Sequence, residues 1–126
     1  MDKVFELKPG VVWKDMSVEF EWDLSRWMQV ADFIRNVCGG VPTITSARDG
    51  KHSINSLHSE GAALDIRIKD WKEHFYAESY CKTIAWLLGK KWVVVLEDTH
   101  IHCQLGTRNI RNPEHIQKIG NGNYLR

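Results

Sequence analysis

The stretch WVVVLEDTHIHCQL, residues 92–105, predicts a β-hairpin. Residues 92–96 include three consecutive valines, and β-branched side chains favour strands. Residues 97–99 are polar and turn-like, and residues 100–105 alternate polar with apolar side chains. Two strands joined by so short a turn are close enough in sequence to pair antiparallel.

The alternation in the second strand divides its side chains between two faces. Ile101 and Cys103 then face the core, while His100 and His102 project together from the opposite face. Two such histidines are compatible with simple exposure to solvent. They also offer neutral imidazoles, which are standard zinc ligands, so this pattern alone leaves both interpretations open.

The remaining elements are predicted from periodicity and from the residues that end them. Asp23 is suited to cap the start of one helix, and Gly39-Gly40 and Gly89 are suited to end two helices. The predicted elements, in chain order, are a helix over 24–37, strands over 43–45 and 62–68, and a helix from Asp70 or Lys72 to Leu88.

This order of elements predicts an α+β fold with a small, mainly antiparallel sheet packed against helices. We expect a single domain over 1–126, because this length leaves no room for two ordinary domains. Residues 106–126 are predominantly polar and are expected to form a C-terminal tail. In this tail, Pro113 is suited to the first position of one short helix.

Composition excludes some classes of protein. Seventeen Lys and Arg against sixteen Asp and Glu give a formal net charge of +1, which argues against binding nucleic acid by neutralising phosphates. The three cysteines, Cys38, Cys81 and Cys103, are far apart and odd in number. We therefore expect reduced, mostly buried thiols and neither a disulfide framework nor a Cys-ligated zinc knuckle.

The chain also has no stretch that approaches the roughly 18 to 20 apolar residues of a membrane span. Its first nine residues contain no apolar run of the length found in signal peptides. We expect a protein that is soluble and cytoplasmic when made, monomeric, and not inserted in a membrane.

A polar loop over 46–60 separates two predicted strands, and a loop of this length in a compact domain is usually functional or disordered. His58 lies near its end, and Gly61 permits a tight turn. Asp65 follows on an otherwise apolar strand. A carboxylate that enters the core there needs a salt bridge, several hydrogen bonds or a metal as its partner.

His58, Asp65 and one histidine of the hairpin together provide three nitrogen and oxygen ligands. Three such ligands with an open fourth position are typical of catalytic zinc sites, whereas structural sites are usually closed and rich in cysteine. A carboxylate of the adjacent turn, Glu97 or Asp98, could act as a general base. The alternative is a metal-free polar network of the same side chains.

The segments SLHSEGAALD, residues 56–65, and HIHC, residues 100–103, resemble the two motifs of the zinc D-Ala-D-Ala carboxypeptidase family. This family also includes vancomycin-resistance dipeptidases, phage L-Ala-D-Glu endopeptidases, murein endopeptidases and the hedgehog signalling domain, whose motifs look especially similar. The resemblance covers residues 40–105 and implies a hedgehog- or DD-peptidase-like fold.

The resemblance also implies a role for each matching residue. It implies that the zinc ligands are His58, Asp65 and His102. Glu97 would be the base, and His100 would stabilise the transition state. Arg48 would bind a carbonyl or carboxylate of the substrate. An open alternative is the spacing Glu97-x-x-His100, which several members use and which would make His100 the third ligand. Asp98 is the alternative base.

The function that the resemblance implies is zinc-dependent hydrolysis of a peptide bond in bacterial peptidoglycan. The protein would be a carboxypeptidase or an endopeptidase, such as a phage endolysin or a virion wall enzyme acting on the cell wall, or a cytoplasmic dipeptidase. Its partner would be a peptidoglycan peptide. The rival hypothesis is a hedgehog-like module that contains zinc and binds without turnover, and the identity of the cleaved bond stays open.

Overall fold

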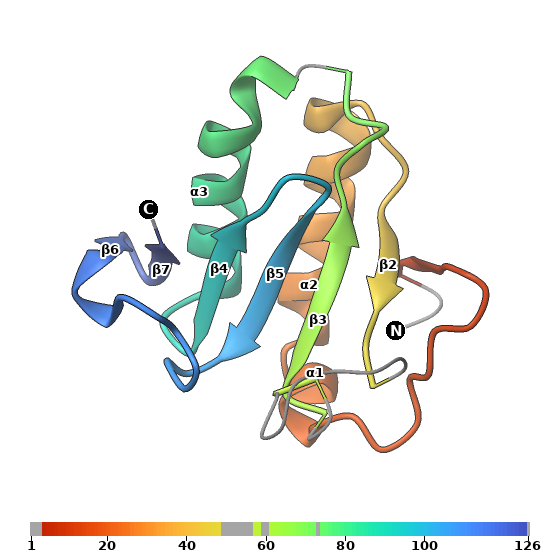
Figure 1. Ribbon diagram of the computed structural model, residues 1–126. Coiled ribbons are helices and arrows are strands. Elements are labelled where there is room, and N and C mark those ends of the chain that lie inside the picture. Colours follow the sequence, from red (N-terminus) through yellow and green to blue (C-terminus); the bar gives the residue numbers. More distant parts are fainter. Residues whose placement is uncertain (1–3, 49–56, 59–60, 73, 126) are drawn as a thin grey trace.

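A computed structural model of the chain describes residues 4–48, 57–58, 61–72 and 74–125. Within these residues, seven strands form one mixed sheet in the order β1-β2-β3-β5-β4-β7-β6 (Figure 1), so the predicted α+β class is confirmed. The strands are β1 (Glu6–Leu7), β2 (Thr43–Ser46), β3 (Ala63–Arg67), β4 (Trp92–Leu96), β5 (His100–Leu105), β6 (Ile116–Ile119) and β7 (Gly122–Leu125).

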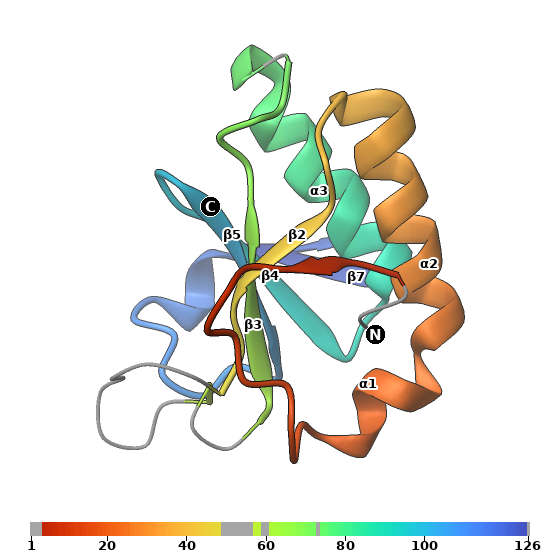
Figure 2. The same cartoon turned by 90° about the vertical axis from the view of Figure 1, so that its right-hand side faces the viewer.

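The long helices α2 and α3 pack side by side on one face of this sheet (Figure 2). The helical elements are α1 (Val18–Trp22), α2 (Leu24–Phe33), the π-helical turn η1 (Ile34–Cys38), the 3₁₀ turns η2 (His74–Tyr76) and η3 (Pro113–His115), and α3 (Ala77–Leu88). Within the part of the chain that the structure describes, no helix combines the length and the apolar character needed to cross a bilayer.

Three aromatic side chains form the centre of the core and join the helices to the sheet. Trp27 stacks on Phe20 with 5.7 Å between ring centroids, and Trp92 meets both rings edge-on at 5.1 and 4.8 Å. All three side chains are fully buried, and such edge-on and stacked pairs are favourable beyond their buried area. Asp23 occupies the N-cap position of α2, as predicted, but its carboxylate makes no capping hydrogen bond and instead accepts one from the Trp92 indole N–H at 2.9 Å.

The helix predicted over 24–37 is present as α2 and η1, and it ends at Gly39, whose φ of 72° suits glycine. Its predicted apolar stripe is only partly buried, because Met28 and Val37 are 50% and 51% exposed. The π-helical turn contains more residues per turn than an α-helix. In this turn Cys38, four residues after the buried Ile34, is buried, while Val37 points towards solvent.

The second helix begins at Ala77 and not, as predicted, at Asp70 or Lys72. Contacts with a distant segment hold these earlier residues in a turn. The Asp70 carboxylate accepts a hydrogen bond from the Val41 N–H at 3.0 Å, and the Lys72 N–H donates to the Cys38 carbonyl at 3.0 Å. Tertiary contacts thus override the local helical pattern there.

The predicted strands and the β4–β5 hairpin are confirmed, but the sheet also contains two parallel pairs, β1–β2 and β4–β7. Residues 106–126, expected to be a polar tail, contain the further strands β6 and β7 as well as the short helical turn expected at Pro113. Tyr124 of β7 is buried in the core. A Cβ at Gly122 would lie 2.0 Å from the Ala85 carbonyl oxygen, so this close contact with α3 requires glycine.

The cysteines are buried and free, as predicted. Burial raises the pKa of the Cys38 thiol to about 12, and it also raises the pKa values of Cys81 and Cys103. The three thiols are therefore protonated near neutral pH and act as small apolar side chains in the core.

Candidate metal centre

The pairing of β3 with β5 places two of the predicted metal ligands opposite each other. Asp65 is the register partner of His102, and the next side chains on the same face are the partners Arg67 and His100. Ile101 and its neighbours on the other face are packed in the core beneath α2 and α3. Alternation along the two strands thus directs the polar set away from the helices, as the sequence predicted for β5.

His58 reaches the same place from the turn that precedes β3. The turn is closed by hydrogen bonds from the Gly61 N–H to the His58 carbonyl at 3.0 Å and from the Ala62 N–H to the Leu57 carbonyl at 2.8 Å. Gly61 has a φ of 72°, and a Cβ there would lie 2.7 Å from the Asp15 carbonyl oxygen. The position therefore requires glycine both for its backbone angle and for its space.

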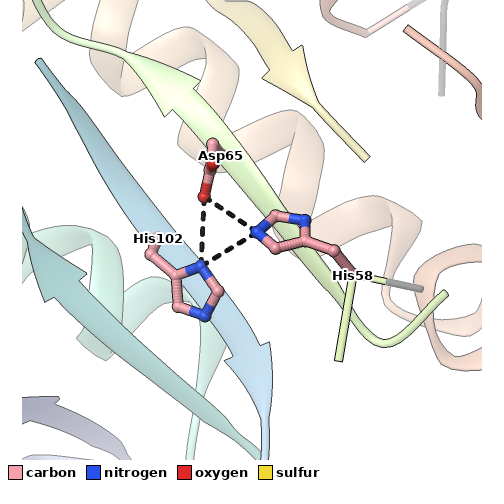
Figure 3. A group of neighbouring side chains, drawn as sticks. All are labelled: His58, Asp65 and His102. Carbon is pink, nitrogen blue, oxygen red and sulfur yellow. Dashed lines mark hydrogen bonds and ion pairs between the residues drawn. The ribbon is translucent and has the colours of Figure 1, made fainter. Parts of the chain in front are cut away.

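The three side chains converge on one point (Figure 3). The Asp65 Oδ1 atom lies 3.0 Å from His102 Nδ1 and 3.3 Å from His58 Nε2, and the two ring nitrogens are 3.2 Å apart. The three side chains are largely buried: His58 is 8% exposed, Asp65 14% and His102 17%. This group could hold a metal ion, and it contains His102 and not His100.

The outer nitrogen of His58 determines which tautomer the ring adopts. Its Nδ1 atom lies 3.0 Å from the Ala47 carbonyl oxygen, which can only accept a hydrogen bond. Nδ1 must therefore carry the proton. In the neutral ring, Nε2 is then unprotonated, and its lone pair is directed at the centre of the cluster.

Gln104 has the same effect on His102. Its amide Nε2 donates to the carbonyls of Gly106 and Arg108 at 2.8 and 2.9 Å, so the amide orientation is fixed and Oε1 faces His102. Oε1 accepts from His102 Nε2 at 2.8 Å. The neutral His102 ring therefore also has its lone pair, on Nδ1, pointing into the cluster.

Two lone pairs and a carboxylate oxygen that face one another at about 3 Å repel unless a cation lies between them. The cation can be a metal ion, or it can be a proton on one of the rings. Neutral imidazole nitrogens, fixed by outer hydrogen bonds to carbonyl oxygens, are the usual form of metal-binding histidines. The donor set and its surroundings thus fit a metal ion.

The pKa values of the same groups describe the alternative state, in which a proton on one ring takes the place of the metal ion. Burial alone raises the pKa of Asp65, but hydrogen bonds from His102 and His58 outweigh it and hold that pKa well below its usual range. Burial likewise lowers the pKa of His102, but hydrogen bonds with Asp65 and Gln104 outweigh it and give a net increase. Without a metal, the cluster therefore favours a carboxylate beside an imidazolium.

His100 and Glu97 lie next to the cluster and contact each other. His100 Nε2 is 3.2 Å from Glu97 Oε2 and 3.6 Å from Asp65 Oδ2, while its Nδ1 is 3.0 Å from the Thr99 hydroxyl. Glu97 is 47% exposed, so its carboxylate can reach both water and the edge of the cluster. The neighbouring Asp98 is exposed on the same turn.

The remaining predicted residues lie around this centre. The Arg48 guanidinium donates to the Asp15 carbonyl at 3.2 Å, and Arg48 directly follows Ala47, whose carbonyl orients His58. Its contact with substrate stays a prediction. Ala63 is buried on β3, and Ser56 of the motif lies outside the described residues.

Sequence reasoning missed Gln104 and the Ala47 carbonyl. Gln104 had a detectable signal, because it follows His100 and His102 at the same two-residue spacing and so shares their face. It is only 4% exposed, and a buried amide needs partners. A backbone carbonyl has no such signal, since every residue has one.

In chemical terms, the centre provides two imidazole nitrogens and one carboxylate oxygen, which leaves at least one coordination position open for water or substrate. A half-exposed carboxylate and a third histidine border this position. When the chain is compared with known proteins, neither a family model nor a curated protein matches it.

Proposed function

We propose that the protein is a zinc-dependent peptidase that hydrolyses a peptide bond in the stem peptides of bacterial peptidoglycan. The observation that carries this proposal is the convergence of His58, Asp65 and His102, with the lone pairs of both rings directed at one point. The choice of peptide as substrate rests on the resemblance of the two motifs to the D-Ala-D-Ala carboxypeptidase family. The finer fold assignment, hedgehog- or DD-peptidase-like, is part of the same proposal.

Zinc suits this donor set, because two neutral imidazoles and a carboxylate with an open position are the ligand pattern of hydrolytic zinc sites. When bound, zinc supplies a Lewis acid that polarises the scissile carbonyl and lowers the pKa of the attacking water. The chain's own contribution is to hold the three ligands in place. Ala47 and Gln104 do so by fixing the two imidazole tautomers.

Glu97 is the proposed general base. It accepts a proton from the attacking water and delivers it to the leaving amine. Its position beside His100 keeps the carboxylate at the edge of the cluster, whereas Asp98 has no such contact among the described residues. His100 and Arg48 supply positive or hydrogen-bonding groups for the charge that develops on the carbonyl oxygen.

The test is release of soluble muropeptides from purified sacculi, followed by mass spectrometry that identifies the bond. We expect release by the zinc-loaded chain and none after chelation. Glu97→Gln should retain zinc and lose about 10²- to 10⁴-fold in rate, with Asp98→Asn as the matched control.

Each other outcome has a definite meaning. Bound zinc without release of peptides would contradict the peptidase and favour the non-catalytic binding module. Loss of activity in Asp98→Asn but not in Glu97→Gln would move the base to Asp98. A protein that binds no zinc would reduce the centre to a polar network.

A further inference from the structure

A second feature lies on the same face of the sheet, next to the metal centre. It is an open hollow of about 340 Å³ in which cationic and hydroxyl side chains predominate. The lining residues are Lys8, Thr45, Arg67, Lys69, Thr99 and His100. His100 belongs to both places, since its ring also lies 3.6 Å from Asp65.

The register of β3 and β5 gives the distance between the two places. Arg67 pairs with His100 one step along the ladder from the pair Asp65 and His102. Two residues in a strand span about 7 Å, and both pairs point to the same face. An extended peptide bound along the sheet would therefore reach from the metal centre to the hollow within about two residues.

The hollow is strongly positive for a chain whose formal net charge is only +1. Lys8, Arg67 and Lys69 contribute three cations, and within the described ranges none of them forms an ion pair. Of the nearby carboxylates, Asp65 and Glu97 contact histidines, and Asp98 lies on the exposed turn before Thr99 and forms no ion pair with these cations among the described residues. Three cations without protein counter-charges around one hollow attract an anionic ligand.

We infer that this hollow binds a carboxylate of the substrate within about two residues of the scissile bond, so that the substrate is an acidic peptide. The inference rests on the proposed function for the location of that bond. Arg67 is the central group, because it is half-buried, and its guanidinium can bind a carboxylate through two parallel hydrogen bonds. The carboxylate can come from a D-Glu residue of the stem peptide or from its free C-terminus.

The test compares acidic peptides with their neutral counterparts, by NMR titration of the full chain with and without zinc. One pair is acetyl-L-Ala-D-Glu and acetyl-L-Ala-D-Gln, each with its C-terminus amidated. The other pair is acetyl-D-Ala-D-Ala and its C-terminal amide. We expect the acid of one pair to bind about three- to tenfold more tightly than its neutral partner, and the pair that shows this preference identifies the source of the carboxylate.

Variants assign that preference to the hollow. Arg67→Gln should remove it, Arg67→Lys should retain part of it, and Arg111→Gln, which removes an exposed arginine elsewhere, should leave it unchanged. If Arg67→Gln does not fold, Lys69→Gln with Lys118→Gln as its control gives the same comparison at exposed positions. Equal binding of acid and amide, or a preference that survives these changes, would overturn the inference.

The same samples separate this inference from the proposed function. Hydrolysis of a peptide without any preference for acids would support the peptidase and contradict the role of the hollow. A preference for acids that depends on Arg67, without hydrolysis of any peptide or release from sacculi, would support the hollow and contradict the peptidase.

Discussion

The two faces of strand β5 differ in what their side chains contact. Ile101 and Cys103 are fully buried beneath α2 and α3, where they belong to the hydrophobic core. On the opposite face, His102 is also largely buried, but its contacts are the carboxylate of Asp65 and the amide of Gln104. One strand thus combines an apolar surface that stabilises the fold with a polar surface whose groups require a bound cation.

This difference predicts that the two faces respond to different changes. Substitutions on the helix-covered face should lower the free energy of unfolding and leave the affinity for metal largely intact while the protein stays folded. Substitutions on the open face should lower the affinity for metal and leave the free energy of unfolding of the metal-free protein largely unchanged. Each prediction below either separates the two faces or shows that they are coupled.

The largest expected effect on stability is that of Trp92→Ala. The indole is fully buried against the edges of Phe20 and Trp27, so its removal should lower the free energy of unfolding by about 3 to 5 kcal/mol, measured by urea denaturation. Trp22→Ala is the matched control, because Trp22 is 74% exposed and should cost less than about 0.5 kcal/mol. Loss of zinc affinity in folded Trp92→Ala would show that the faces are coupled.

The next largest effect is expected for Asp65→Ala on the open face. This change removes a ligand and leaves two imidazole lone pairs facing each other at 3.2 Å. Zinc affinity, measured by competition with a chromogenic chelator, should fall by more than about 100-fold, and peptide release should disappear. Asp32→Ala, at an exposed position of α2, should retain both properties.

Gln104→Ala should weaken zinc binding without removing a ligand. His102 loses the acceptor that fixes its tautomer, and the expected decrease in affinity is about 10- to 100-fold. Long-range ¹H–¹⁵N spectra of His102 in the metal-free protein should show a changed tautomer, which simple destabilisation would not produce. Gln29→Ala on α2 should leave the spectrum and the affinity unchanged, and an unaltered His102 tautomer in Gln104→Ala would contradict this account.

The sequence predicted the elements around the candidate metal centre better than it predicted the edges of the sheet. The segments 92–96 and 100–105 carry strong strand signals and form the centre of the sheet, where register is determined by the buried face. From that register, a shared face for His100 and His102 follows directly. The meeting of Asp65 with His102 instead required β3 to pair with β5, which periodicity alone does not reveal.

Strands β6 and β7, at the edge of the sheet, were not predicted from the sequence. Half of their eight residues are polar or glycine, and Tyr124 is buried because α3 and β4 provide a partner surface. The start of α3 illustrates the same limit, because the contact of Asp70 with the Val41 N–H joins segments far apart in the chain. Where long-range contacts decide a local structure, local sequence patterns do not contain the necessary information.

The smallest effect expected is a dependence of stability on pH that differs between the metal-free and the zinc-loaded protein. In the metal-free protein, the raised pKa of His102 contributes stability that is fully present below about pH 6.5 and is lost as pH rises through the folded-state pKa. The lowered pKa of Asp65 contributes stability above about pH 4 that is lost at lower pH. The metal-free protein should therefore become less stable on the alkaline side of neutrality.

Zinc should cancel that decrease, because the proton on His102 competes with the metal for the same lone pair, and in excess zinc the stability should instead rise with pH up to about pH 6.5. Below the folded-state pKa of His102, each pH unit should increase apparent zinc affinity by up to about tenfold, or about 1.4 kcal/mol of added stability in excess zinc. Thermal unfolding at several pH values, with zinc or with a chelator, measures both slopes. Parallel slopes in the two series would mean that the metal does not displace this proton and does not bind between His58, Asp65 and His102.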